Sequence, residues 1–203
     1  RAVIRKGKIS FIEQQTSAGP VFTLIDEDAN VCQGGRVGIW IQDHFYRADA
    51  NGKILIPFSV SRYGPAILVH NDFAQLTHID LQQENYDFKC GYIYNNESFL
   101  MGNKARILVQ PRLFLNGQTA NIELMKNCSA TITTINEDGI PSKFNFEKLK
   151  FSATQETELE FPIPAKLREI QIEVKGQITP MNKKEPVDYS SNMNIPIEAN
   201  NLH

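Results

Sequence analysis

The sequence has 203 residues, of which 41% are hydrophobic and 22% charged, a composition that excludes disordered and collagen-like proteins. Its 21 basic and 23 acidic residues leave a net charge of −2, without the basic excess of a dedicated nucleic-acid binder. No apolar run approaches the roughly 20 residues of a membrane-spanning helix. We therefore expect no nucleic-acid partner and no membrane insertion by this segment.

The first eighty residues contain short runs in which apolar and polar side chains alternate, as they do in half-buried strands. No segment has the periodicity of an amphipathic helix, so crossover helices between parallel strands are not expected. Asp49-Ala50-Asn51-Gly52 lies between two of the runs and predicts a hairpin turn. The predicted strands are residues 21–25, 36–41, 45–47, 54–58, 66–70 and 76–81.

The polar stretch Gln82–Asn85 interrupts this rhythm and predicts a domain boundary. A second series follows, in which residues 105–115 form the strongest predicted strand and Asn116-Gly117 predicts a tight hairpin. Asn136-Glu137-Asp138-Gly139 predicts another hairpin. Further strands are predicted at residues 130–135, 144–151, 159–163, 170–174 and 192–197. We expect the aromatic side chains of these runs to form a core: Phe114, Phe144, Phe146, Phe151 and Phe161.

Short strands with tight turns indicate an all-β fold made of two tandem antiparallel β-sandwich domains, immunoglobulin-like or prealbumin-like in class. We place the first domain at residues 1–84 and the second at residues 85–203. Because the sequence begins at Arg1 and lacks a signal-peptide pattern, we expect it to be a segment of a longer protein.

Two family resemblances rest on these segments. Thr23–Asp28, Gly34–Ile39 and Arg47–Ile56 follow the order strand, polar turn, glycine pair, strand and Asp-x-x-Gly turn. This order resembles the transthyretin-like or carboxypeptidase-regulatory-like sandwich family over residues 15–82, although Gly35 stands where alanine is common there. The resemblance implies a β-sandwich for the first domain.

The second domain has its own pattern in the strand and turn 105–118, the run and turn 130–141 and the segments 158–164 and 170–178. It resembles a macroglobulin-type domain of the α2-macroglobulin and complement superfamily over residues 86–198. The Cys-Gly-Glu-Gln thioester motif of that superfamily does not occur, so its protease-trapping chemistry is not carried over to any residue here.

Four side chains form the best local candidate for metal binding: His70, Asp72, His78 and Asp80. If two paired strands brought them together, two imidazoles and two carboxylates would suit Zn²⁺ or another divalent ion. The alternative, which we favour, is a hairpin whose turn is shaped by Asn71-Asp72. For Asp26-Glu27-Asp28 we likewise favour a solvated turn over a Ca²⁺ loop, because the ligand spacing of such a loop is missing.

Trp40 and Tyr46, with Phe45 between them in sequence, suggest an aromatic platform for a sugar or a peptide. In the alternating pattern Trp40 falls opposite Val37 and Ile39 and is expected to face outward. Cross-strand aromatic packing is the alternative that we favour, since large aromatic side chains usually serve packing.

Export is suggested by Asn96-Glu97-Ser98 and Asn127-Cys128-Ser129, which fit the N-glycosylation pattern. We therefore expect a secreted, cell-surface or periplasmic location. The three cysteines, Cys32, Cys90 and Cys128, allow at most one internal disulfide, and their spacing does not say which.

Catalytic signatures are missing from the sequence: it has neither a Gly-x-Ser-x-Gly elbow nor a phosphate-binding loop. We therefore expect no enzyme and no cofactor, but a structural or protein-interaction module that contacts other domains of its own or a partner chain. Two alternatives stay open. One is a carbohydrate- or ligand-binding module that uses Trp40 and Tyr46, and the other is a metal-dependent enzyme that uses the four His and Asp residues above.

Overall fold

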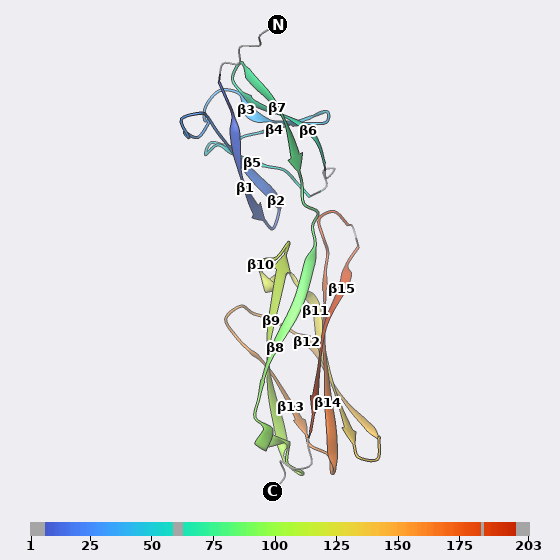
Figure 1. The fold of residues 1–203 in the computed structure, drawn as a ribbon. Helices are drawn as coiled ribbons and strands as arrows, with labels where there is room; N and C mark the ends of the chain where they lie inside the picture. The colour runs from blue at the N-terminus through green and yellow to red at the C-terminus, as the bar shows by residue number, and fades with distance from the viewer. Residues whose placement is uncertain (1–6, 59–62, 184, 198–203) are drawn as a thin grey trace. The chain divides into compact units, whose positions relative to one another are not determined.

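The computed structural model of the chain describes residues 7–58, 63–183 and 185–197. They form antiparallel strands with two short 3-10 helices, η1 and η2, which confirms the predicted all-β class (Figure 1). The chain divides into two compact units, unit 1 (residues 1–85) and unit 2 (residues 86–203). Within the described residues, no helix is long and apolar enough to span a membrane.

The elements of unit 1 are β1 (Ser10–Thr16), β2 (Gly19–Ile25), β3 (Val37–Ile41), β4 (His44–Arg47), β5 (Lys53–Leu55), β6 (Tyr63–His70) and β7 (Phe73–Asp80). Those of unit 2 are β8 (Tyr86–Tyr94), η1 (Asn96–Phe99), β9 (Lys104–Leu115), β10 (Gln118–Ala120), η2 (Ile122–Leu124), β11 (Lys126–Asn136), β12 (Pro141–Leu149), β13 (Thr157–Pro162), β14 (Leu167–Ile178) and β15 (Val187–Pro196).

Unit 1 consists of a three-stranded sheet, in the order β1-β2-β5, and a four-stranded sheet, in the order β4-β3-β6-β7. Alternate residues of each strand contribute to one core, because successive strand side chains point to opposite faces. The fully buried members of this core include Phe22, Leu24, Ile39, Ile54 and Ile56. Unit 1 is therefore a sandwich whose outer faces carry the intervening residues.

The two acidic-to-glycine turns, predicted as equivalent hairpins, differ in the structure. Asn136 and Gly139 close the hairpin between the paired strands β11 and β12, as predicted. The Asp49–Gly52 turn instead joins β4 to β5, which belong to different sheets, so the hairpin prediction is wrong there. Asp49 Oδ1 accepts hydrogen bonds from the backbone N–H of Asn51 and Lys53, both at 2.8 Å. These bonds form within the turn itself, so the same turn sequence can join strands of one sheet or of two different sheets.

Unit 2 pairs a sheet built around β9 with a four-stranded sheet in the order β12-β11-β14-β15. β9 pairs with β8 along one edge and with β10 and β13 along the other. Every second residue of β9 from Ala105 to Leu115 is buried. Ser191 of β15 links the two sheets: its Oγ accepts from the Cys90 N–H at 3.2 Å, and its carbonyl accepts from the Tyr92 hydroxyl at 3.4 Å.

The predicted aromatic core of unit 2 is only partly correct. Phe151 and Phe161 are buried, whereas Phe114, Phe144 and Phe146 are half-buried. Phe114 lies on the outer face of β9, where the Lys89 ammonium sits 5.8 Å from its ring centroid. We predicted burial from the aromatic residue type, but the burial of each ring depends on which face of its strand the residue occupies.

Candidate functional site

Four apolar side chains form a row across the outer face of the β4-β3-β6-β7 sheet of unit 1. The strand register places Phe45 opposite Trp40, Trp40 opposite Ile67, and Ile67 opposite Leu76. Directly opposed residues of antiparallel strands project from the same face. We call these four residues the apolar row.

The apolar row lies outside the core because its neighbours along each strand face inward. Ile39 and Ile41 flank Trp40 and are buried, which directs the indole to the other side of β3. Leu76 is 66% exposed and Ile67 39% exposed, whereas Trp40 and Phe45 are half-buried. The row is thus a contiguous apolar strip that solvent reaches, the kind of surface that marks protein contacts.

Phe45 is held beside Trp40 by what surrounds it. The two rings lie 5.3 Å apart between centroids, and the Arg36 guanidinium lies 5.2 Å from the Phe45 centroid. Gly38 lies on β3 between Arg36, which precedes the strand, and Trp40, and a Cβ at Gly38 would collide with the Phe45 ring. The missing side chain therefore leaves room for the ring, which a cation–π contact and an aromatic contact both hold.

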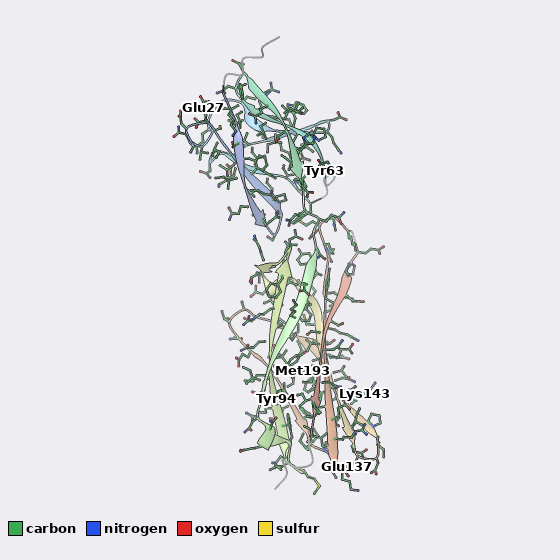
Figure 2. All side chains as sticks on the ribbon, in the orientation of Figure 1. Glu27, Tyr63, Tyr94, Glu137, Lys143 and Met193 are labelled. Atoms are coloured by element: carbon green, nitrogen blue, oxygen red, sulfur yellow. The ribbon has the colours of Figure 1, made fainter. Side chains whose placement is uncertain are left out.

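The outer face continues along β6 and β7 beyond the apolar row. Tyr63, which Figure 2 labels, is 71% exposed and stacks on His78 at a centroid distance of 6.0 Å. Tyr63 and Pro65 share the face of Ile67 by strand alternation, and Asp80 pairs with Tyr63. An aromatic residue, an imidazole and a carboxylate therefore border the strip on this side.

The predicted pair Trp40 and Tyr46 is not brought together. Tyr46 pairs with Ile39 and packs against the core on the opposite face of the sheet from Trp40. Its ring contacts His44 at 4.4 Å, and burial raises the pKa of its hydroxyl. The expected outward position of Trp40 agrees with the structure, but its aromatic neighbour is Phe45.

The predicted metal ligands do not converge either. His70 ends β6 on the inward side of the strand alternation, whereas His78 and Asp80 lie on the outward side of β7. Asp72 belongs to the turn between β6 and β7. His70 pairs with Phe73, and His78 follows Phe73 by five residues on β7, so His78 lies about 17 Å along the hairpin from His70. Within the described residues, no three His, Cys, Asp or Glu side chains gather as metal ligands would.

The acidic stretch after β2 is a self-contained turn. Asp26 Oδ1 accepts hydrogen bonds from the N–H groups of Asn30 at 2.9 Å and Asp28 at 3.0 Å. The bond from Asn30 is the main reason that the pKa of Asp26 is lowered. Glu27 is exposed (Figure 2). The Asp26 carboxylate is thus already hydrogen-bonded to the backbone of its own turn.

The three cysteines are free thiols, and burial raises the pKa of each. For Cys90 the pKa rises to about 11. A nucleophilic cysteine needs the opposite, a lowered pKa that leaves thiolate at neutral pH. Cys32 and Cys128 are buried members of the cores, as the small hydrophobic character of cysteine suggests.

Sequence reasoning missed Ile67, Leu76, Tyr63 and Arg36 as parts of the candidate site. A signal was present, because Ile67 lies between the buried residues Ala66 and Leu68, and Leu76 occupies an outward position of a run that ends with the buried Ile79. What the sequence does not contain is the register that sets Ile67 between Trp40 and Leu76.

Comparison with known proteins identifies a family and a relative of the chain. The model of the family described as the AbpF third immunoglobulin-like domain matches residues 95–203, more than half of the chain. Actin-binding protein F of Dictyostelium discoideum is 25% identical over 206 residues, which cover 96% of this chain and 9% of that protein. The chain thus spans only a small part of the length of this relative.

A crystal structure of a tetra-tandem repeat in the extending region of a large adhesion protein aligns with 94% of this chain and 49% of its own, with a TM-score of 0.34 and 11% identity. That similarity is too low to indicate shared function. The transthyretin-like and macroglobulin-type resemblances stay predictions. The residues that match the family model begin between β8 and η1 and run to the end of unit 2. Because they make up more than half of the chain, the chain belongs to the AbpF third immunoglobulin-like domain family.

Proposed function

We propose that the chain is a non-enzymatic protein-interaction module whose contact surface is the apolar row of unit 1. The observation that carries this proposal is the continuous register Phe45–Trp40–Ile67–Leu76 on an exposed sheet face. Covering such a strip removes apolar surface from water at about 25 cal/mol per Å². A partner that presents a complementary apolar surface would gain most from it.

The composition of this face suits a binding hot spot. Tryptophan, tyrosine and arginine are the residues most enriched at energetically dominant interface positions. Here Trp40 lies within the row, Arg36 is stacked over Phe45, and Tyr63 lies at the margin. Trp40 and Tyr63 lie on strands of the β-sandwich and Arg36 directly precedes one, so a partner meets a surface that needs little ordering.

Actin is the first partner to test, because the Dictyostelium relative is named an actin-binding protein. We expect the chain to sediment with actin filaments, and Leu76→Glu to weaken that binding by about tenfold or more, since it places a charge in the apolar contact. Ile12→Glu is the matched control: Ile12 is 58% exposed in the same unit but belongs to the other sheet, and its replacement should leave binding unchanged.

Each outcome of the sedimentation experiment decides one point. A wild-type chain that stays in the supernatant at all actin concentrations contradicts actin as the partner. Equal sedimentation of the wild type and both variants contradicts the apolar row as the contact surface. Circular dichroism of the variants shows whether the strand content is intact.

An oligosaccharide is the second candidate ligand, favoured by the exposed ring of Tyr63 and the half-buried, outward-facing ring of Trp40. Trp40 is the only tryptophan in the sequence, so its fluorescence reports on this face alone. We expect simple oligosaccharides to leave the emission unaltered, and the chain to sediment with actin filaments. A saturable change in emission with a sugar, together with no sedimentation with actin, would favour the accessory-module alternative.

Export is a further proposal, supported by the exposure of both acceptor asparagines. Asn96 lies in η1 with an exposed side chain, whereas the Asn127 amide donates to Gln177 Oε1 at 2.7 Å. When the chain is expressed with a signal peptide in a eukaryotic secretory host, we expect glycosylation at Asn96 before Asn127, because Asn127 must first release that bond. Mass spectrometry after glycosidase treatment measures it, and a secreted chain with no glycan on either residue contradicts the proposal.

A further inference from the structure

β12 forms one edge of the four-stranded sheet of unit 2, with β11 on its only paired side in the described part of the chain. Exposed and half-buried side chains alternate along β12. Lys143, Asn145 and Glu147 are exposed, and Phe144 and Phe146 are half-buried toward the core. Figure 2 shows Lys143 at the margin of the sandwich. An unpaired strand of this kind is a template for another strand.

The hairpin fixes which backbone groups of β12 face outward. The Asn136 N–H donates to the Ile140 carbonyl, which starts the β11–β12 ladder. Antiparallel pairs alternate between hydrogen-bonded and non-hydrogen-bonded, so Ser142, Phe144 and Phe146 direct their N–H and C=O groups to β11. The backbone groups of Lys143 and Asn145 are therefore directed away from β11.

The exposed sequence of β12 is complementary to itself when it is run antiparallel. If Asn145 of one copy pairs with Asn145 of a second, Lys143 stands opposite Glu147 twice, and Phe144 stands opposite Phe146 twice. The opposed charges attract, and the half-buried rings become cross-strand aromatic pairs. The outward backbone groups then supply about six hydrogen bonds across the two-fold axis.

Both ends of this segment limit how far the pairing can extend. Pro141 has no N–H to donate at one end. At the other end Lys148 has a φ of +55°, and the register with β11 shifts there by a β-bulge. A bulge bends the strand and stops regular pairing. The segment that can pair is thus Lys143–Glu147, centred on Asn145.

We propose that two copies of this chain associate through their β12 edges, antiparallel and centred on Asn145, so that their four-stranded sheets join. The inference is independent of the apolar row, which lies in unit 1. It also predicts charge selectivity, because like charges opposed at Lys143 and Glu147 would repel.

Sedimentation equilibrium of the whole chain at low salt, up to about 200 µM, tests the proposal by mass action. We expect a monomer–dimer equilibrium that Lys143→Glu weakens by about tenfold or more, because two Glu–Glu oppositions replace two Lys–Glu pairs. The double variant Lys143→Glu/Glu147→Lys restores the opposed charges and should return the dissociation constant to within about threefold of the wild type.

Asn145→Pro removes an outward N–H and leaves the backbone bonds between β12 and β11 in place, so it should abolish the dimer. It also removes the Asn145 Oδ1 atom that accepts from Thr131 Oγ1 of β11 at 3.1 Å, so circular dichroism must confirm that the strand content is kept. Lys183→Glu, the same charge change in an exposed turn, is the control and should have no effect. A chain that stays monomeric throughout, a dimer indifferent to Lys143→Glu, or a double variant without recovery would each overturn the proposal. If Asn145→Pro misfolds, the charge variants decide alone.

Discussion

Replacing Phe22 with alanine is expected to lower the free energy of unfolding of unit 1 by about 3–5 kcal/mol. Phe22 is fully buried at the centre of the core, and its ring meets Phe11 edge-on at 5.4 Å. It lies opposite Ile54 on β5, itself fully buried. Truncation would therefore leave a large cavity within a rigid pair of sheets that closes only in part.

Denaturant titration followed by Trp40 fluorescence measures this effect, because the only tryptophan belongs to unit 1. Ile12→Ala is the control: Ile12 is on β1 beside Phe11 but points outward, and its replacement should cost less than about 1 kcal/mol. A loss below about 1 kcal/mol for Phe22→Ala would mean that this residue does not anchor the core.

Gly19→Ala is expected to destabilise unit 1 by about 3 kcal/mol or more, through two separate costs. Gly19 has a φ of +136°, a conformation essentially restricted to glycine. A Cβ there would also collide with the Ile56 carbonyl oxygen, a backbone atom that cannot move aside alone. The Ile56 N–H donates to the Pro20 carbonyl at 3.0 Å, so any shift at this point disturbs the contact between β2 and the chain after β5.

Gly34→Ala separates the two costs. Gly34 has a φ of +74°, but a Cβ there meets nothing within 4 Å, so only the conformational penalty of about 1–2 kcal/mol applies. The same fluorescence-detected titration compares the two variants. Equal losses for Gly19→Ala and Gly34→Ala would show that the predicted collision at Ile56 contributes nothing.

The sequence predicted those parts of the fold that depend on neighbours along the chain. The strongest predicted strand, residues 105–115, is β9, and the dipeptide Asn116-Gly117 forms the expected turn, with φ values of +50° and +80°. β1 was not predicted, since its polar run Glu13-Gln14-Gln15 has no alternating pattern. Its place beside β2 comes from seven successive pairings along that strand.

The candidate site illustrates the same division. Trp40 was expected to face outward, because Val37, Ile39 and Ile41 alternate around it, and it does. Tyr46 was expected beside it, but Phe45 and Tyr46 are consecutive strand residues and must face opposite ways. Only the pairing of Trp40 with Phe45 shows which of the two joins the indole.

By itself, the sequence determined the all-β class, the inward and outward sides of strands with clear alternation such as Val37–Ile41, and the local turns, because these depend on periodicity and on backbone preferences within a few residues. Tertiary structure alone decided which strands are neighbours and in which register. That register separates His70 from His78, joins Ile67 to Trp40 and Leu76, and leaves β12 as an edge. Pairing is a long-range choice among many strands of similar pattern, so the surface that it builds is not encoded in any one segment.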